Sequence, residues 1–429
     1  MEEHGNNSPH QLSKIRRNDL NDVPGDEAEM FEIKGANATA ACYATQIEEA
    51  AIEQIRTMCD QEFARGSCIA IMPDAHPGAG CTIGTTMTIV DKVVPNLVGV
   101  DIGCGMYTVS LGREQLNLAH IDEACHFVPS GRNIWDGRQE RFPLTDFRCY
   151  RSLKDAKRLG RALGTLGGGN HFIEIDRAPD GEQFLVVHSG SRNLGTQVAT
   201  LYQNIAIDLN RGKGELFKQR EALIVRYKAE GRRSEIQPAL KELNRSFEAK
   251  ELTAPAELCW LYGEWLDDYL HDMELCQQFA RRNRELIARV VLERVGITPG
   301  ESFHTTHNYI DTSERILRKG AIAAHKGERV LIPINMRDGS IIATGRGNAD
   351  WNWSAPHGAG RLFSRTEAKQ RLNMEDFKAA MEGIYTTSVR EDTLDEAPMA
   401  YKSIDDIIGP IADSVDIEAI IKPIYNFKA

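Results

Sequence analysis

The alternation of apolar and polar positions predicts one helix and a series of short strands in the first half of the chain. Across residues 47–65, apolar side chains recur every three or four positions and Gly66 follows, as is typical of an amphipathic helix that ends at a capping glycine. Short runs rich in β-branched and aromatic residues, separated by glycines and turn residues, predict strands. These runs are residues 68–72, 85–90, 97–100, 106–110, 172–175 and 184–187.

The middle of the chain follows a different pattern. Residues 213–295 are charged and have the period of helices, with Pro238 and Pro255 as the expected breaks between two or three of them. Residues 1–30 are polar and rich in turn formers, which predicts a loosely ordered tail. Together the elements predict an α+β fold, with helices outside a sheet core and a helical insertion in the middle. We expect a single domain over residues 31–429 that includes the helical block 211–295.

Composition and charge narrow the class of protein. The 429 residues are 41% apolar, which is enough for a large core, yet no run approaches the roughly 18 apolar residues of a membrane helix. The first thirty residues lack the apolar run of a signal peptide, so we expect no export and no membrane span. A net charge of -11 argues against a protein that coats nucleic acid with its whole surface, but a local basic groove stays open. Nine scattered cysteines without a Cys-x-x-Cys pair favour the cytoplasm.

Five of the twelve histidines stand beside glycine-rich turns or strand ends, where chemically active side chains often lie. Residues 98–105 carry Asp101 and Cys104 three positions apart among glycines, so that a carboxylate and a thiolate could face one ion. In residues 163–175, glycines expose backbone N–H groups to an anion, and strand alternation predicts Glu174 on the face opposite His171. The five histidines are His76, His171, His188, His307 and His357.

These side chains suggest a metal site. One thiolate, one carboxylate and three imidazoles could hold one or two divalent ions of the Mn, Fe, Co or Zn type, provided that they converge in space. The alternative is a set of tight turns in a β-rich core. Asp74 and His76 could add further ligands or a proton carrier. The proposed ligands are Asp101, Cys104, His171, His188 and His307.

A second chemical candidate is His357, which lies between Pro356 and a run of small residues that would let a bulky group approach its ring. Imidazole is largely neutral and nucleophilic near neutral pH, and Arg361 could neutralise phosphate charge during a reaction. The alternative is the polar start of a helix. The chain has neither a Gly-x-x-x-x-Gly-Lys-Ser/Thr loop nor the Lys-x-Asp-Gly of lysine-based ligases.

Six motifs in the same order resemble the RtcB family of RNA ligases, and the resemblance runs from about residue 68 to the end of the chain. It implies an RtcB-like α+β fold and an enzyme that joins RNA ending in a 2′,3′-cyclic phosphate or 3′-phosphate to RNA with a 5′-hydroxyl. It also implies GTP, two Mn²⁺ ions and, as a further partner, an archease-type activator. The motifs are Pro73-Asp74, Gly99 to Gly105, Gly167 to Phe172, His188 to Arg192, His307-Asn308 and His357 to Arg361.

Carried over residue by residue, the resemblance makes the five proposed ligands bind the manganese pair, with Cys104 bridging, and makes His357 the nucleophile that accepts GMP. Ile334, Asn335 and Pro356 depart from the residues usual in the family. The implied guanylate-binding positions are Asn170, His171, Phe172, Ile173, Glu174, His307, Asn308, Pro333, Ile334, Asn335, Met336, Ser340, His357, Gly358, Ala359, Gly360 and Lys428.

RNA contacts are expected on a basic face, since Arg151, Lys154, Lys157, Arg158 and Arg161 follow a helical spacing just before the glycine-rich turn. A solvated charged face is the alternative. A metal-dependent RNA phosphoesterase, a 3′-end guanylyltransferase without efficient ligation, and a non-catalytic RNA-binding relative are the rival functions. The remaining candidates for phosphate or RNA contact are Asp74, His76, Arg192, Arg318, Lys319, Arg361 and Arg365.

Overall fold

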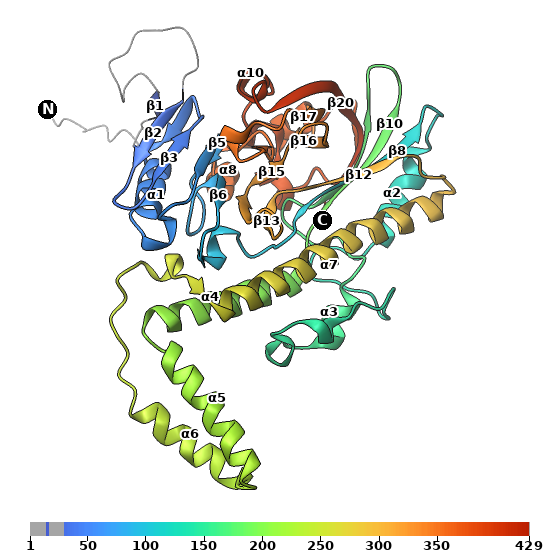
Figure 1. Cartoon of the computed structure of the whole chain (residues 1–429). Coiled ribbons are helices and arrows are strands. Elements are labelled where there is room, and N and C mark those ends of the chain that lie inside the picture. Colours follow the sequence, from blue (N-terminus) through green and yellow to red (C-terminus); the bar gives the residue numbers. More distant parts are fainter. Residues whose placement is uncertain (1–13, 17–29, 429) are drawn as a thin grey trace, which may run out of the picture.

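Two antiparallel sheets form the centre of the molecule in the computed structural model, which describes residues 14–16 and 30–428 (Figure 1). The larger sheet has β19 (Tyr385–Thr386) attached in parallel to β20. Its other strands are, in order, β12 (Ser302–Thr306), β8 (Gly105–Gly112), β10 (Gln183–Ser189), β9 (Phe172–Arg177), β20 (Val415–Lys428), β17 (Gly339–Gly345) and β16 (Arg329–Asn335).

The second sheet is antiparallel except where β3 meets β5. Its order is β13 (Asn308–Asp311), β14 (Ile316–Lys319), β6 (Ile83–Thr88), β5 (Ile69–His76), β3 (Thr39–Cys42) and β2 (Phe31–Lys34). Three two-stranded ribbons complete the β structure: β1 (Lys14–Arg16) with β4 (Gln46–Glu48), β7 (Lys92–Val93) with β11 (Leu261–Tyr262), and β15 (Ala321–Ala323) with β18 (Ser354–Pro356).

Helices cover the sheets on the side of the long helix α7 (Glu264–Val295), which packs against β8, β10 and β13 (Figure 1). One apolar core lies between α2, α7 and the larger sheet, and another joins α1, α4 and α7 to the smaller sheet. The other helices are α1 (Glu49–Cys59), α2 (Leu118–Phe127), α3 (Ala156–Arg161), α4 (Arg192–Asn210), α5 (Gly214–Ala229), α6 (Ile236–Arg245), α8 (Arg365–Arg371), α9 (Met374–Ala380) and α10 (Asp405–Ile411).

Helices α5 and α6 pack against each other and project from the body as an arm beyond α4 (Figure 1). Both helices lie within residues 213–295, and Pro255 falls between α6 and α7. Pro238, however, lies inside the first turn of α6, where a missing N–H costs nothing, and the chain turns instead at Gly231, which has φ +76°. Among the described residues, no helix is both long and apolar enough to cross a membrane.

Most predicted strands are confirmed, but the run 97–100 is not a strand. Pro95–Leu97 forms a short 3-10 helix, because Pro95 lacks an N–H for a sheet ladder, and Gly99 then turns the chain with φ +97°. The tail predicted over residues 1–30 falls mostly outside the described residues. Within it, β1 pairs with β4.

The predicted mixture of a sheet core with surrounding helices is confirmed, and the two sheets meet where the chain passes from β12 to β13. His307 is the single residue between these strands. Cys104 lies directly before β8, His188 lies near the end of β10 and His171 lies directly before β9. Because β8, β10 and β9 are neighbours, these three side chains meet at one edge of the larger sheet.

Candidate active site

A cluster of three side chains offers ligand atoms for a metal ion. The sulfur of Cys104 lies 3.2 Å from Nε2 of His188 and 3.5 Å from Nε2 of His171, and all three residues are buried. Register brings them together, because His188 stands opposite Met106 on one side and Phe172 on the other. The convergence that sequence spacing left open is thus present for these three residues.

The second nitrogen of each ring fixes which nitrogen faces the cluster. Nδ1 of His171 bonds the carbonyl of Leu166 at 2.8 Å, and Nδ1 of His188 bonds the carbonyl of Asn170 at 3.0 Å. A carbonyl only accepts, so Nδ1 of each ring carries a proton, and in the neutral form of the ring Nε2 keeps its lone pair for a metal. Burial and the neighbouring His171 hold the pKa of His188 well below its usual range, which keeps this ring neutral.

Asp101 and His307 border this cluster on two sides. Oδ2 of Asp101 lies 3.0 Å from Nε2 of His171, while the ring centres of His307 and His188 are 5.2 Å apart. Burial, with Asp101 adding, raises the pKa of the Cys104 thiol well above its usual value, so a bound metal ion would have to displace a proton from this sulfur. Soft sulfur, imidazole and a carboxylate form a donor set that fits divalent transition ions.

Two further side chains, both on α7, hold the backbone around the cluster in place. Asn283 on α7 is fully buried, and its Oδ1 accepts from the backbone N–H groups of Gly164 and Thr165 at 2.7 and 3.1 Å. Its Nδ2 donates to Oγ of Ser189 at 2.9 Å. Arg284 donates from one nitrogen to the carbonyls of Gly103 and Ser189, at 2.7 and 2.9 Å. Helix α7 therefore joins the glycine-rich turn, β10 and the turn before β8.

His357 lines the same cavity as His307, and the centres of the two rings are 5.2 Å apart. Its Nδ1 is 2.8 Å from Oδ2 of Asp74, a carboxyl on β5 that is fully buried. A carboxylate accepts, so Nδ1 carries a proton, and the neutral form of the ring has its lone pair on Nε2. Gly360 allows this approach, since it has φ +74° and a Cβ there would come within 2.8 Å of the Asp74 carbonyl oxygen.

The structure places Asp74 in the interior, whereas the sequence suggested RNA contact for it. The side chain is fully buried, out of reach of a macromolecule, and its partner is His357. His76, two residues along the same strand, does line the cavity beside His357. Burial and His357 lower the pKa of His76 to about 4, so its ring is neutral at neutral pH.

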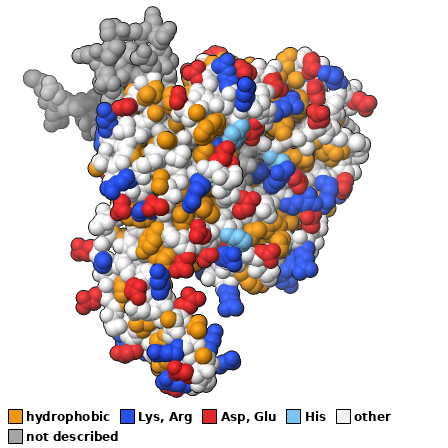
Figure 2. Space-filling model, in the orientation of Figure 1, with side chains coloured by type: hydrophobic (Ala, Val, Ile, Leu, Met, Phe, Trp, Pro, Cys, Tyr) orange, Lys and Arg blue, Asp and Glu red, His pale blue; other side chains and the backbone are white. Residues whose placement is uncertain are grey.

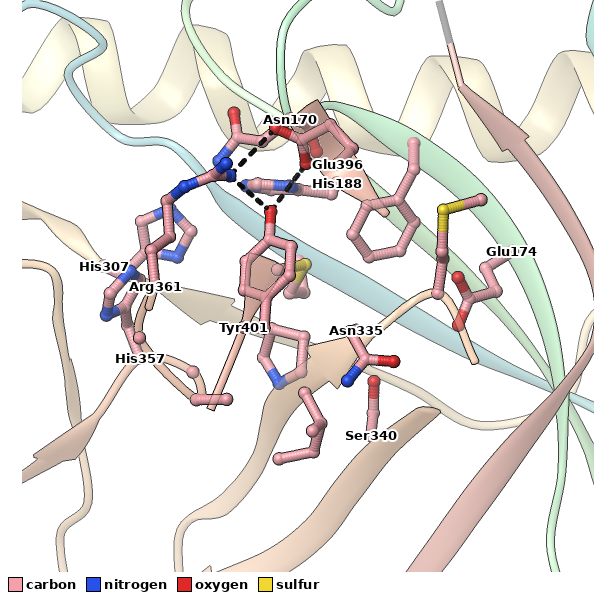
Figure 3. Close-up of a pocket in the computed structure, with 18 of the residues that line it drawn as sticks. Asn170, Glu174, His188, His307, Asn335, Ser340, His357, Arg361, Glu396 and Tyr401 are labelled. Carbon is pink, nitrogen blue, oxygen red and sulfur yellow. Dashed lines mark hydrogen bonds and ion pairs between the residues drawn. The ribbon is translucent and has the colours of Figure 1, made fainter. Parts of the chain in front are cut away.

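A cavity of about 260 Å³ opens between the two sheets and holds most of the expected guanylate positions (Figure 3). Three expected residues lie elsewhere: His171 belongs to the cluster, Ile173 packs into the core on the opposite face of β9, and Oδ1 of Asn308 accepts from the N–H of Gly320 at 3.0 Å. The expected residues that do line the cavity are Asn170, Phe172, Glu174, His307, Pro333, Ile334, Asn335, Met336, Ser340, His357, Gly358, Ala359, Gly360 and Lys428.

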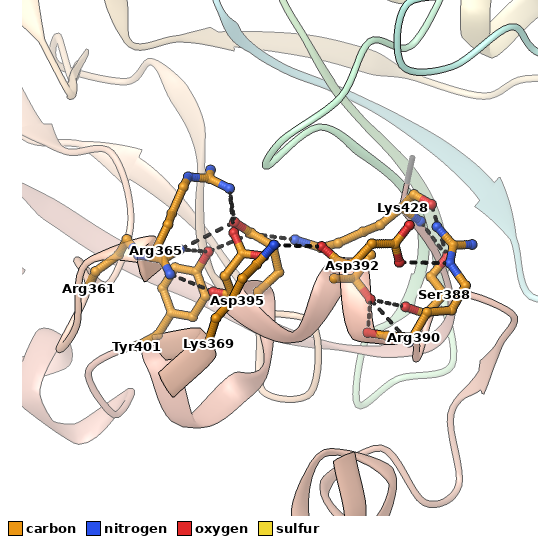
Figure 4. A network of polar contacts seen from close by, with 11 residues as sticks. Arg361, Arg365, Lys369, Ser388, Arg390, Asp392, Asp395, Tyr401 and Lys428 are labelled. Carbon is orange, nitrogen blue, oxygen red and sulfur yellow. Dashed lines mark hydrogen bonds and ion pairs between the residues drawn. The ribbon is translucent and has the colours of Figure 1, made fainter. Parts of the chain in front are cut away.

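One end of this cavity is a charged network around Glu396 (Figures 3 and 4). Its buried carboxylate accepts from Lys428 Nζ and Tyr401 Oη, both at 2.7 Å, and pairs with Arg361 at 3.3 Å and Arg365 at 2.8 Å. Burial alone would raise the pKa of Glu396, but Lys428 and Arg365 outweigh it and lower this pKa to about 2. Sequence analysis missed Glu396 and Tyr401, because neither stands in a glycine-rich motif.

A second cavity, of about 490 Å³, lies on the other side of the cluster. Asp101 and His171 form part of its wall, and Arg132, Arg158 and Arg192 line the rest of the side near α3. Arg192 is tied down by Oγ1 of Thr165 at 3.0 Å and by the carbonyl of Gly131 at 2.7 Å. Figure 2 shows Lys and Arg side chains gathered over this region.

The expected basic helix is shorter than predicted. Helix α3 begins only at Ala156, so Arg151 and Lys154 precede it and do not share a helical face with Lys157. Asp155, with φ +53°, caps the helix and prevents its continuation toward residue 151. Arg161 points back to the loop, where its Nε donates to the carbonyl of Trp135 at 2.7 Å.

Two other cations expected to bind phosphate are structural instead. Arg318 is fully buried and donates to Oγ of Ser354 at 2.8 Å and to Oη of Tyr309 at 3.0 Å. Nζ of Lys319 donates to the backbone carbonyl of Ala79 at 2.6 Å. Both residues belong to β14, an interior strand of the smaller sheet, and the assignment of the pair to phosphate contact is wrong.

Comparison with known proteins identifies the family. The model of the family described as tRNA-splicing ligase RtcB matches residues 54–141 and 148–429. The chain belongs to the RtcB family. The RNA-splicing ligase RtcB of Escherichia coli K12 is 31% identical over 403 residues, which cover 84% of this chain and 90% of the relative. The tRNA-splicing ligase RtcB of Aeropyrum pernix is 27% identical over 431 residues, which cover 82% and 85%.

Two of the three residues that are expected to depart from the family pattern lie at the cavity. Ile334 and Asn335 line it at the end of β16, and Asn335 is held by Asp338, whose Oδ2 accepts from its Nδ2 at 2.8 Å. Pro356 stands opposite Ala321 in the β15–β18 ribbon, where the lack of an N–H is tolerated at a strand end. Ile334 and Asn335 therefore belong to the cavity wall, and none of the three residues belongs to the cluster of Cys104, His171 and His188.

Proposed function

We propose that this chain is a GTP-dependent RNA ligase that joins a 2′,3′-cyclic phosphate or 3′-phosphate RNA end to a 5′-hydroxyl RNA end, in RNA repair or tRNA splicing. Family membership and the names of its relatives as splicing ligases support the reaction class. The observation that carries the proposal is the position of His357. It stands with a free Nε2 between the metal-type cluster and a cavity of nucleotide size.

In this proposal, two Mn²⁺ ions would be held by Asp101, Cys104, His171, His188 and His307. When bound, such ions neutralise phosphate charge and orient the phosphate for in-line attack. The chain contributes ring orientation, because Leu166 and Asn170 fix the Nδ1 protons of His171 and His188. The neutral state of His188 and His307, caused by burial, keeps their nitrogens available.

His357 would act as the nucleophile toward GTP. Its Nε2 lone pair forms a bond to the α-phosphorus, and the bond from that phosphorus to the bridging oxygen of pyrophosphate breaks. Asp74 stabilises the positive charge that the ring gains while Nδ1 keeps its proton. The nucleotide would lie in the cavity, with Glu174, Ser340 and Lys428 toward the base.

The remaining steps would take place on RNA. A water molecule opens a cyclic end to the 3′-phosphate, an oxygen of that phosphate takes GMP from His357, and the 5′-hydroxyl oxygen then attacks the activated phosphorus and expels GMP. The second cavity suits the incoming RNA backbone, since Arg132, Arg158 and Arg192 line it beside the cluster.

The test uses repurified protein, Mn²⁺ and GTP labelled at the α-phosphate. Label that is lost in acid but survives denaturation of the chain is expected on the wild type and on His120→Ala, an exposed histidine of α2, and not on His357→Ala. Joining of a 2′,3′-cyclic phosphate RNA to a 5′-hydroxyl RNA is measured in parallel. Label without joining would indicate a 3′-end guanylyltransferase. No label on metal-loaded protein, with RNA end hydrolysis retained, would indicate a phosphoesterase.

A further inference from the structure

Strand β9 carries two carboxyl groups on the same face, because residues 174 and 176 are two positions apart. Glu174 lines the nucleotide-sized cavity, whereas Asp176 lies one step farther inside and is fully buried. Within residues 14–16 and 30–428, no group other than Glu174 is placed to hydrogen-bond either oxygen of Asp176. Burial without a donor disfavours an ionised carboxylate, so this position favours the protonated form of Asp176.

The surroundings of Asp176 are apolar on both neighbouring strands. Phe184 of β10 and Pro423 of β20 stand opposite it, and Pro423 has no N–H to donate. Phe184 also belongs to an apolar cluster with Val186 and Ile421. The charged group that acts on Asp176 is Glu174.

Glu174, by contrast, has partners that favour its ionised form. Nδ2 of Asn426 donates to its Oε2 at 2.5 Å, and the ammonium of Lys428 on β20 acts on its charge. Burial raises the pKa of both carboxyls, and for Asp176 the charge of Glu174 raises it well above its usual value. Two buried carboxyls in this relation share one proton near neutral pH, and the partners of Glu174 place that proton on Asp176.

We infer that Asp176 is a neutral carboxylic acid whose hydroxyl donates to Glu174. This hydrogen bond fixes the orientation of the Glu174 carboxylate, and so determines which of its lone pairs face the cavity. Asp176 is a positioning residue, since it does not line the cavity itself. With Asn426 bonded to one side of Glu174 and Asp176 to another, the acceptors left over suit two adjacent N–H donors of a purine base. This last step rests on the proposed binding of a guanine nucleotide.

The first test needs no nucleotide. Infrared difference spectra of the ligand-free protein at pH 7 compare the wild type with Asp176→Asn. The difference is expected to contain the carbonyl band of a protonated carboxylic acid, whereas Asp180→Asn, in the exposed turn after β9, is expected to remove only a carboxylate band. A carboxylate band in the Asp176 difference would overturn the inference.

The second test measures GTP affinity by calorimetry between pH 6 and pH 9 in the presence of Mn²⁺. Asp176→Asn keeps an N–H donor and is expected to bind within a fewfold of the wild type at pH 7, while Asp176→Leu loses roughly tenfold or more. As the pH rises and the shared proton leaves, wild-type affinity is expected to fall. Asp176→Asn cannot ionise, so its affinity is expected to change less.

The positioning role would be refuted if Asp176→Leu bound GTP as tightly as the wild type. It would also be refuted if GTP affinity depended on pH in the same way in the wild type and in Asp176→Asn. Thermal melting checks that both variants fold, and Leu is compatible with the apolar neighbours Phe184 and Val186. The two proposals fail separately. A wild type that binds no GTP counts against the proposed function, whereas the infrared result on Asp176 stands or falls without any ligand.

Discussion

The pair of Asp74 and His357 gives the sharpest test of the proposed chemistry. Replacing Asp74 with asparagine keeps the shape of the side chain and an acceptor oxygen for Nδ1, but removes the charge 2.8 Å from the ring. A hydrogen bond to a charged group contributes about 1.5–3 kcal/mol, against about 0.5–1.5 for a neutral one. The loss is therefore about 1–2 kcal/mol of transition-state stabilisation, or roughly five- to thirtyfold in rate.

The assay is single-turnover formation of labelled His357 at saturating GTP, together with a separate measurement of GTP affinity. Asp74→Asn is expected to slow labelling and leave affinity within about twofold, because the charge that Asp74 stabilises develops only during attack. Asp91→Asn is the control, since Asp91 is an exposed carboxylate that pairs only with Lys92 on the surface. Labelling at the wild-type rate, or a defect confined to affinity, would refute this role of the carboxylate.

Three further predictions concern the metal, the frame and RNA. Mn²⁺ affinity should fall by up to about tenfold for each unit that the pH is lowered, because burial keeps the Cys104 thiol protonated and the ion must displace that proton; a flat metal titration would contradict this. Asn283→Ala should lower the free energy of unfolding by about 2–4 kcal/mol in urea, and the exposed Asn244→Ala by little, since only Asn283 satisfies buried backbone groups; equal losses would contradict this. Arg158→Ala should weaken RNA binding and reduce the salt slope by about 1, with Lys218→Ala on the arm as a control; an unchanged slope would exclude Arg158 from phosphate contact.

The sequence predicted secondary structure best where the residues of a segment themselves determine whether it forms a helix or a strand. The run 184–187 is apolar throughout and forms the buried strand β10. The run 97–100 is apolar except for Gly99 and does not form a strand, because Pro95 begins a 3-10 helix that ends at Leu97 and Gly99 then turns the chain. Local backbone chemistry therefore overrode hydrophobicity at one place and agreed with it at the other.

Only those site residues that stand in recognisable motifs could be predicted from the sequence. Glycine-rich turns marked His171 and His188, but the contact between Asp74 and His357 joins residues 283 positions apart, and no period or spacing expresses it. Glu396 lies in an ordinary acidic stretch, and its role follows from cations that β20 and α8 bring to it. Arg318 was misassigned because the sequence does not reveal that β14 lies inside a sheet.

The two cavities on either side of the metal-type cluster have a kinetic consequence. His188 and His307 face one cavity, while Asp101 and His171 face the other. A small ligand and a polymer that arrive from different sides need not pass each other, so neither must leave before the other can enter. With the covalent intermediate of the proposed mechanism, GTP would react first, and the guanylylated protein would persist until a broken RNA strand diffuses into the other cavity.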